Sequence, residues 1–520
     1  MRVLLFFIML LFMAGCTKLG PDFKKEDSVK FPKDLKRDTN ATDKELASWW
    51  DMFHDKTLDA LIQKAYAQNI DIKQAGLRIL QSRTILGISK GLVYPQAQTL
   101  SGSAISSLQN SKTVNSVGVN FDVGWEIDFW GKYARGIESA EATLYMSVAS
   151  YRDIMTTVVA EVARNYINYR VAQERIIYAK RNIAIQEKVA KMTEIQFNSG
   201  NVSELDMQQA RTQLYSTRAK LPAIRLSKVN SLNAIALLLG IPKEEVAVML
   251  ENDFHDKTDN YIKNKNSTVV EIKDNKDDYL GVSIIPRGAF DPTSKIDISL
   301  IKRRPDIQIA EYKARAQSAK IGSTKALLYP SFILVGNIGI NSNDISGNFV
   351  SFDDAMGVSA GPSFRWNIFN YGRIKNQIRL QDAIFEESML NYNKTVLKAI
   401  NDVSNALNGY MYTKLQLQEN EKALKATVRA FNLSARQYND GLVSYQRLLS
   451  TVEKLTITQD VYAQIKGLVS IDEILLYKSL GGGWQYSKGK DYISKETKER
   501  LQKSGVDWGD YLDDVRFNDE

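Results

Sequence analysis

The chain has 520 residues, of which 44% are hydrophobic, and a net charge of +8. One cysteine and two histidines exclude an intrachain disulfide, a CxxC redox pair and a Cys₂His₂ zinc site. Lys and Arg are interspersed with Glu and Asp along helix-like segments, a pattern typical of solvated helix faces rather than of a nucleic-acid interface. Because the sequence also has no phosphate loop or paired acid–base motif, we expect no enzymatic activity, catalytic residue, metal, cofactor or nucleic-acid partner.

The N-terminus predicts export and lipid attachment. A single positive residue precedes an apolar run, Val3–Met13, that is too short to cross a membrane and is typical of a signal peptide, which we assign to residues 1–15. Two small residues then lead to the only cysteine, Cys16, in an arrangement that resembles a bacterial lipobox. The resemblance implies that Cys16 is lipidated and that residues 16–55 form a lipid-anchored segment. An ordinary signal peptide with an incidental cysteine is the alternative.

Residues 56–240 predict a first structural unit of helices and two strands. Apolar and polar residues alternate from Val117 to Phe129, which is the period of a strand with two different faces. Tyr94–Ala104 is polar and weakly patterned, and we assign it as the partner strand mainly because the second copy of the unit requires one. The unit therefore reads as a helix, a strand pair at 92–130, a long helix at 132–197 and a return helix at 203–239.

The long helix has the features of a coiled coil. Residues 132–197 contain no proline, and a seven-residue repeat of mostly apolar residues runs from Val148 to Phe197, which predicts a helix of about 100 Å. Gly200 follows at a turn, where glycine adopts positive φ freely and ends the helix. Pro222 lies inside the return helix, and we expect it to kink or break that helix.

Residues 300–484 repeat the first unit. Glycines at equivalent turns are separated by a constant 241 residues: Gly131 and Gly372, Gly200 and Gly441, and Gly240 and Gly481. Upstream the offset is 235, as for Pro95 and Pro330, and a constant offset over so many residues indicates a duplicated unit. The second unit therefore reads as a helix, a strand pair at 328–369, a long helix at 373–438 and a return helix at 444–480.

Two segments lie outside the repeated units. Residues 241–299 are polar and rich in Asn, Asp and Lys, which predicts a connector between the units. Residues 485–520 are charged and have no counterpart in the first unit. We expect them to form a C-terminal extension that is partly disordered or laid against the middle of the helices.

The strand pairs favour a membrane sheet over a soluble β-sandwich, which is the alternative for alternating strands. The strands are long, and their apolar faces end in aromatic residues, as in the girdle of a membrane β-barrel: Trp125, Trp130, Trp366 and Tyr371. Four strands are too few to close a barrel, and open sheet edges are not tolerated in lipid. Two or three chains must therefore share one barrel.

Several motifs in order resemble the TolC-like outer-membrane efflux family, in its NodT/OprM-type lipoprotein branch. The resemblance extends from Cys16 to about Trp484, and besides the lipobox it rests on these motifs: Trp49-Trp50, Glu126-Ile127-Asp128-Phe129-Trp130-Gly131-Lys132, Arg303-Arg304-Pro305-Asp306-Ile307, Leu328-Tyr329-Pro330-Ser331 and Leu480-Gly481-Gly482-Gly483-Trp484. It implies a mixed α and membrane-β fold with four strands per chain in a shared trimeric 12-stranded β-barrel. Long antiparallel coiled-coil helices would form a periplasmic α-barrel, with residues 241–299 as its equatorial connector.

The same resemblance implies the outer-membrane channel of a tripartite efflux pump. A lipid-anchored homotrimer that spans the outer membrane and extends into the periplasm would pass drugs or other small toxic compounds to the exterior. It would receive them from an inner-membrane RND transporter through a periplasmic adaptor. The exit duct of a type I protein secretion system is the alternative within the family, and a soluble coiled-coil scaffold is the alternative outside it.

In this family the periplasmic end closes to an aperture at residues just after the second glycine turn. The matching positions are Gln446, Ser450 and Glu453, which share one side of the return helix because they are spaced i, i+4 and i+7. Relatives often have an acidic residue where Ser450 stands, so we expect easier opening here and a mouth whose charge is set by Glu453. Gly200 and Gly441 mark the tips that we expect to contact the adaptor.

Overall fold

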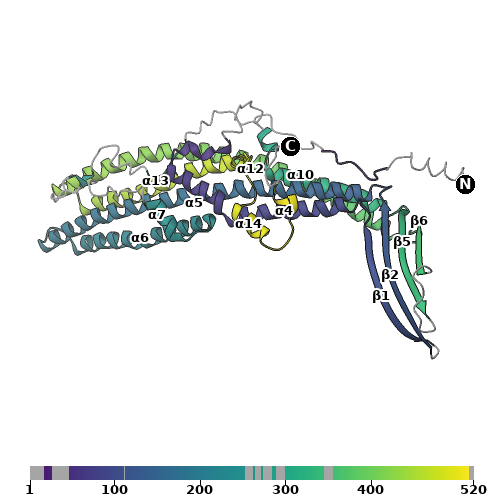
Figure 1. The fold of residues 1–520 in the computed structure, drawn as a ribbon. Coiled ribbons are helices and arrows are strands. Elements are labelled where there is room, and N and C mark those ends of the chain that lie inside the picture. The colour runs from purple at the N-terminus through teal and green to yellow at the C-terminus, as the bar shows by residue number, and fades with distance from the viewer. Residues whose placement is uncertain are drawn as a thin grey trace.

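The computed structural model describes residues 17–25, 46–109, 112–251, 262–263, 271–272, 284–288, 299–344 and 355–513. The predicted signal peptide and Cys16 lie outside the described residues. A long body of helices carries a small β-sheet at one end, and the sheet bends away from the axis of the helices (Figure 1). The sheet and most of the helical body are therefore far apart along the molecule.

The first unit begins after a short 3₁₀ helix, η2 (Trp49–Phe53). Its elements are α3 (Lys56–Gln68), α4 (Ile70–Gly91), β1 (Ala97–Gln109), β2 (Lys112–Ile127), α5 (Lys132–Asn198) and α6 (Glu204–Leu239). Ser203 caps α6 because its side chain accepts a hydrogen bond from the N–H of Asp206, whose carboxylate in turn accepts from the N–H of Ser203. This capping box stabilises the start of the return helix directly after the turn at Gly200.

Helix α6 runs without a break through Pro222, so of the two expectations for this residue, a kink or a break, the break is wrong. Proline removes one backbone donor and costs about 3 kcal/mol in a helix interior. The helix continues because it is packed on both sides of the proline. Thr217 and Ile224 flank Pro222 and are both buried, and Ile224 lies in an apolar cluster with Ala172 and Ala179 of α5.

The second unit has the same order of elements. They are α9 (Ser299–Lys302), α10 (Pro305–Ala326), β5 (Ser331–Asp344), β6 (Met356–Arg365), α12 (Arg373–Asn439) and α13 (Tyr445–Ser479). Helices α5 and α12 are both 67 residues long, which corresponds to about 100 Å each. Ser444 occupies the N-cap position of α13, but its side chain makes no capping hydrogen bond.

The four long strands form one antiparallel sheet in the order β1-β2-β5-β6. Phe121 of β2 lies opposite Leu100 of β1 and Ile338 of β5. Strand β1 is fully paired along its length despite its weak sequence pattern, because its backbone hydrogen bonds need no particular side chains. The repeat was therefore a better guide to β1 than its own residues.

The long helices pack side by side. Helix α5 packs against α4, α6, α10 and α13, and α12 packs against α10 and α13. Large apolar side chains remain exposed on both α6 and α12: Leu205, Tyr215, Leu226, Leu237, Leu390, Leu397, Tyr412 and Leu415. Among the described helices, none is long and apolar enough to cross a membrane. A single chain thus leaves apolar surface uncovered at two separate helices of its body.

The connector is not confined to the middle of the helical body. It contains α7 (Lys243–Glu251), β3 (Ile262–Lys263) and β4 (Glu271–Ile272). Gly288 donates a hydrogen bond to Glu473 of α13 at 2.9 Å. At this level α13 lies against Gly409, which is near the middle of α12. The side chain of Asn432 donates to the carbonyl of Ile272 and accepts from its N–H, both at 2.9 Å. Asn432 lies 23 residues beyond Gly409, or about 35 Å along α12, so the connector also reaches towards the far end.

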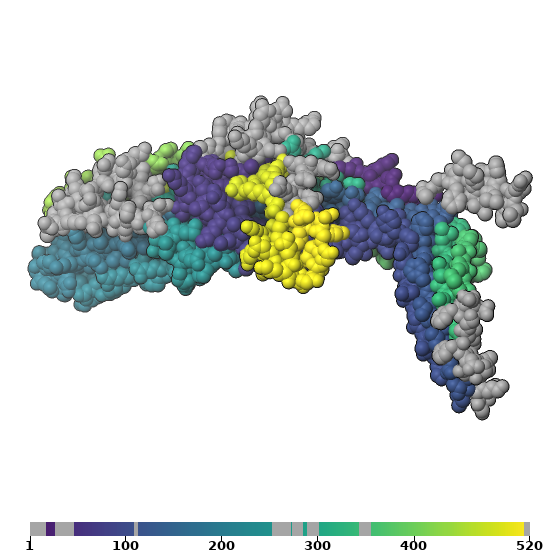
Figure 2. Space-filling view, in the orientation of Figure 1, coloured from purple at the N-terminus to yellow at the C-terminus, as the bar shows by residue number. Residues whose placement is uncertain are grey.

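The C-terminal extension packs against the helical body as far as Asp513. It contains η4 (Trp484–Ser487), α14 (Lys495–Gln502) and η5 (Gly509–Leu512), and Figure 2 shows it as a yellow mass over the middle of the molecule. Tyr492, Ile493 and Leu512 are buried in the largest apolar core together with residues of α3, α4 and α5. Of the two expected arrangements, the described part therefore has the packed one.

A buried ion pair joins α5 to α13. Lys466 Nζ lies 2.9 Å from Glu174 Oε2, and the two side chains are 3% and 1% exposed. Burial raises the pKa of the Glu174 carboxyl and lowers the pKa of the Lys466 ammonium group, and the attraction between them opposes both shifts. Each charge therefore stabilises the other in this interface, and Arg287 and Arg181 add a weaker attraction on Glu174.

We expect Lys466→Met to lower the free energy of unfolding by about 3–5 kcal/mol at neutral pH, because it leaves a buried carboxylate unpaired. The double variant Glu174→Leu/Lys466→Met restores much of that loss, since an apolar pair of similar size carries no desolvation cost. The loss in Lys466→Met shrinks as the pH falls, because a carboxyl group with a raised pKa is protonated more readily in the folded state. Urea unfolding followed by circular dichroism measures all three effects, and equal stability of the single and double variants would contradict the argument.

Candidate functional site

The two faces of the sheet differ sharply in chemistry. One face carries exposed apolar side chains from all four strands: Leu100, Val119, Phe121, Ile338, Val358 and Phe364. On the other face Asn120 and Asn341 exchange side-chain hydrogen bonds of 3.0 and 3.2 Å, and Asn337 donates to Asp122 at 2.7 Å. An apolar outer face and a polar inner face are the arrangement of a transmembrane β-barrel.

Tryptophans hold the strand ends to the helices in the same way in both units. The indole N–H of Trp125 donates to the carbonyl of Val93 at 2.9 Å, and that of Trp366 donates to the carbonyl of Leu328 at 2.9 Å. Trp130 adds a bond of 2.8 Å to the carbonyl of Pro330 across the two units. These aromatic residues at the strand ends therefore fix the segments through which α4 and α10 enter the sheet.

The residues directly after Cys16 lie at the junction between the sheet and the helices. Arg135 of α5 is 1% exposed, and it donates to the carbonyls of Leu19 and Gly20 at 2.9 and 3.0 Å. Leu19 N–H donates to the carbonyl of Trp130 at 3.2 Å. Residues 17–25, which we call the N-terminal strap, are thus held at the start of α5, where the sheet joins the helices.

Charged groups reinforce the strap. Lys18 forms an ion pair with Glu138 at 2.7 Å, and Arg135 forms another with the same carboxylate at 2.8 Å. Burial raises the pKa of Glu138, but the hydrogen bonds from Lys18 and Arg135 outweigh this effect, so that the net pKa is lowered. Glu138 therefore stays ionised and keeps both cations in place at neutral pH.

The two glycine turns lie side by side at the far end of the helical body. Gly200 and Gly441 have φ of +76° and +72°, a backbone conformation that glycine adopts at little cost. The hydroxyl of Tyr438 and the side chain of Gln196 form a hydrogen bond between the two long helices just before these turns. Nothing described lies within 4 Å of a Cβ built on either glycine, so both tips are open surface.

The structure places the three predicted aperture residues on one exposed stripe of α13. Gln446, Ser450 and Glu453 are all exposed. Tyr445, directly before Gln446, and Leu448, between Gln446 and Ser450, are buried against α12 and α5. The three residues are therefore free to face a common opening.

Sequence reasoning missed several residues that shape the site. Arg304 was noted only as part of a motif, but it is buried and binds Asp306 at 2.8 Å, Asp402 at 3.1 Å and the carbonyl of Ser479 at 2.9 Å. It thereby ties α10 to α12 and α13. Arg135 carried a usable signal, because the equivalent position in the second unit is the uncharged Asn376. Among the described residues, no group of three His, Cys, Asp or Glu side chains is placed to hold a metal.

The family model described as "Outer membrane efflux protein" matches residues 61–241 and 299–482. The chain belongs to this family. The matched segments are the two structural units, and the unmatched residues between them are most of the connector. The membership predicted from the ordered motifs is confirmed.

Curated relatives match the chain over nearly its whole length. The "Probable outer membrane lipoprotein SilC" of Salmonella typhimurium is 25% identical, over 91% of this chain and 96% of its own. "Nodulation protein T" of Rhizobium leguminosarum bv. trifolii is 27% identical over 86% and 90%. "Cation efflux system protein CusC" of Escherichia coli O6:H1 is 25% identical over 93% and 99%.

Solved structures show the same fold. The outer-membrane channel OprN has a TM-score of 0.75 and 25% identity, and the match covers 90% of this chain and all of that one. The Campylobacter jejuni CmeC outer membrane channel has a TM-score of 0.73 at 20% identity, covering 94% of this chain and 99% of that one. The predicted fold class is confirmed for the chain: a mixed α and membrane-β fold with four antiparallel strands and long antiparallel helices, as in these outer-membrane channels. The chain is an outer-membrane efflux channel whose helices extend into the periplasm.

The strap can be tested at Gly322 of α10. A Cβ at this position would lie 2.4 Å from the carbonyl oxygen of Leu19 and 2.9 Å from Arg135 Cγ, so Gly322→Ala displaces the strap. We expect trypsin to cleave within residues 17–25 on the order of tenfold faster in this variant than in the parent. This factor corresponds to the usual energetic cost of overpacking. Gly136→Ala is the matched control, because a Cβ there meets nothing within 4 Å. Equal cleavage rates in the two variants would show that the strap is not held by this contact.

Proposed function

We propose that three copies of this chain form the outer-membrane exit channel of a tripartite efflux pump of the RND type. The observation that carries the proposal is the sheet: it exposes an apolar face and leaves the outer edges of β1 and β6 unpaired within the described chain. Lipid covers such a face, and neighbouring copies pair such edges. A soluble coiled-coil scaffold offers no reason for either feature.

The helical body supports the same assembly. Exposed apolar side chains on α6 and α12 lie on helices at opposite sides of the layer, so α12 of one copy can pack against α6 of the next. Closure in this way produces a ring rather than an open row. With three copies the ring has twelve strands, and its long helices surround one continuous passage.

The cargo that we propose is drugs or other small toxic compounds, and the chain acts as a passive conduit rather than as an enzyme. Relatives at similar identity carry names as different as "Cation efflux system protein CusC" and "Pyoverdine export outer membrane protein OpmQ". A shared channel with such different cargo indicates that selection is made elsewhere, by the inner-membrane transporter. The periplasmic adaptor then meets this chain at the tips marked by Gly200 and Gly441.

Native mass spectrometry of the detergent-extracted protein from a bacterial host tests the assembly and the anchor together. We expect the mass of three mature chains, each beginning at Cys16 and carrying three acyl groups. Cys16→Ser should remove the acyl mass but keep the trimer, because the barrel and not the lipid holds the copies together. A soluble, unlipidated monomer or dimer that begins elsewhere would overturn the channel proposal.

We further propose that Gln446, Ser450 and Glu453 line the periplasmic aperture. Their shared exposed stripe supports this assignment. Glu453 is the only charged residue of the three, so three copies would place a ring of three carboxylates at the mouth. Carboxylate rings of this kind favour the passage of cations.

In planar bilayers, Glu453→Gln is expected to lower the ratio of cation to anion permeability. One unit charge at about 4 Å in water changes the energy of an ion by about 1 kcal/mol, so the permeability of each ion changes by up to roughly fivefold, in opposite directions for cations and anions. Glu496→Gln, at an exposed position of α14 on the C-terminal extension, is the matched control and leaves the ratio unchanged. Unchanged selectivity in Glu453→Gln would remove Glu453 from the mouth.

A further inference from the structure

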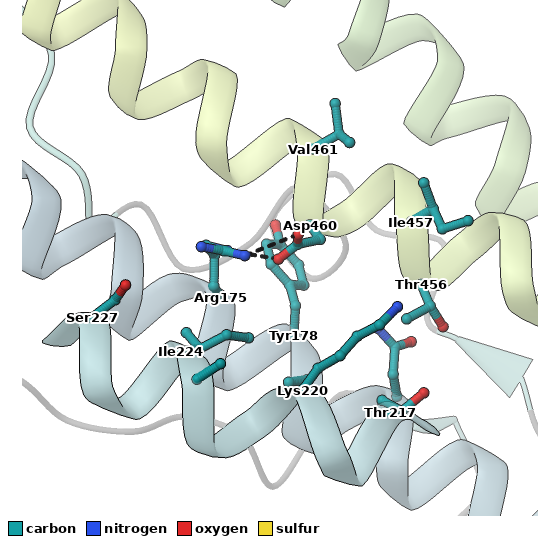
Figure 3. A pocket seen from close by; sticks show the side chains of 13 residues that line it. Arg175, Tyr178, Thr217, Lys220, Ile224, Ser227, Thr456, Ile457, Asp460 and Val461 are labelled. Carbon is teal, nitrogen blue, oxygen red and sulfur yellow. Dashed lines mark hydrogen bonds and ion pairs between the residues drawn. The ribbon is translucent and has the colours of Figure 1, made fainter. Parts of the chain in front are cut away.

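A pocket of about 430 Å³ lies between α5, α6 and α13. Its walls include charged side chains from all three helices, namely Arg175, Lys220 and Asp460, beside the apolar side chains of Ile224 and Val461 (Figure 3). This volume falls within the range of small-molecule sites in proteins. The pocket therefore has both the size and the mixed chemistry of a binding site.

The pocket opens on the same face of α13 as the aperture residues. Ile457, which lines the pocket and is 55% exposed, lies seven residues after Ser450 and four after Glu453. Residues spaced by seven and by four share one side of a helix. Asp460 lies about 10 Å further along the helix axis than Glu453. In the channel proposed above, on which this inference rests, the pocket faces the passage just beyond the aperture.

The pocket has one positive charge that is not balanced within it. Arg175 binds Asp460 with two contacts, Nε to Oδ1 at 2.7 Å and NH2 to Oδ2 at 3.1 Å. Gln464 also donates to Asp460 Oδ2, at 2.8 Å. The charges of Arg175 and Asp460 thus cancel. Lys220 is exposed and has no ion-pair partner among the residues that the structure describes, and Figure 3 shows it reaching from α6 across the pocket towards α13.

We propose that this pocket binds an amphipathic organic anion, with its single negative charge at Lys220 and its apolar body against Ile224, Ile457 and Val461. An inorganic anion would leave those apolar side chains unused, and an organic cation would meet Lys220 unfavourably. The site therefore gives the passage a point of transient contact for one chemical class of cargo. A charged contact at a site open to water holds such a molecule weakly enough for it to leave again.

Titration of the purified protein with 1-anilinonaphthalene-8-sulfonate, an aromatic monoanion that fluoresces in apolar sites, tests the proposal. We expect saturable binding that Lys220→Gln weakens by on the order of tenfold, the loss that one charge-assisted contact represents. Arg225→Gln removes the same charge from an exposed position on the same helix outside the pocket and leaves binding unchanged. Because all three proteins share one detergent background, the difference between the variants isolates the pocket.

Lys220→Glu provides a second test that a general loss of folding cannot mimic. We expect it to weaken binding of the anion further and to strengthen binding of rhodamine 6G, an aromatic cation of similar character. Equal anion binding by the parent, Lys220→Gln and Arg225→Gln would overturn the proposal, as would the absence of saturable binding to the parent. If the protein conducts no ions but binds the anion through Lys220, the channel proposal is refuted and the pocket proposal stands. If the protein conducts ions but its anion binding does not depend on Lys220, only the pocket proposal is refuted.

Discussion

The unpaired edges of a four-stranded sheet are the constraint on which the rest of this structure depends. In hydrocarbon each unpaired backbone group costs several kcal/mol because no water is present to bind it, and β1 and β6 each present a row of them. The strands are antiparallel throughout, so β6 of one copy can pair with β1 of the next in the same antiparallel pattern. Oligomerisation is therefore a condition of residence in the membrane and not a later addition to a finished fold.

That condition fixes the geometry of the helices as well. Each strand pair passes into its long helix through a glycine at positive φ, Gly131 or Gly372, and the indoles of Trp125 and Trp366 hold the strand ends to the preceding helices. Because both junctions are built in the same way, α5 and α12 leave the ring in the same direction and extend for the same length. In the proposed trimer a ring of strands thus continues into a tube of helices, with the exposed apolar residues of α6 and α12 at the contacts between copies.

The sequence predicted the elements that follow from periodicity and from the duplicated unit. It did not predict the features that depend on single tertiary contacts. Alternation located β2 within a few residues, and the repeat located β1, whose own residues are nearly featureless. The helix-breaking effect of Pro222 was overestimated, because the burial of Ile224 against α5 stabilises the helix on the far side of the proline. Other contacts join residues that lie far apart in sequence. Arg135 donates hydrogen bonds to Leu19 and Gly20, Asn432 bonds to Ile272, and Tyr492 is buried in the core. No local pattern encodes such contacts.

The two units preserve the same scaffold but differ in their charges, and the differences coincide with the sites. Subtraction of the 241-residue offset pairs Arg175 with Gln416, Lys220 with Val461, Asp460 with Ala219, Glu174 with Leu415 and Glu453 with Thr212. Turns and strand ends match because both units must leave the ring alike. The charged positions differ because α13 contacts α5 as well as α12, an environment that α6 does not share. The differences between the units thus place a buried ion pair and a charged pocket beside α13 and, in the channel proposed above, an acidic residue at its mouth.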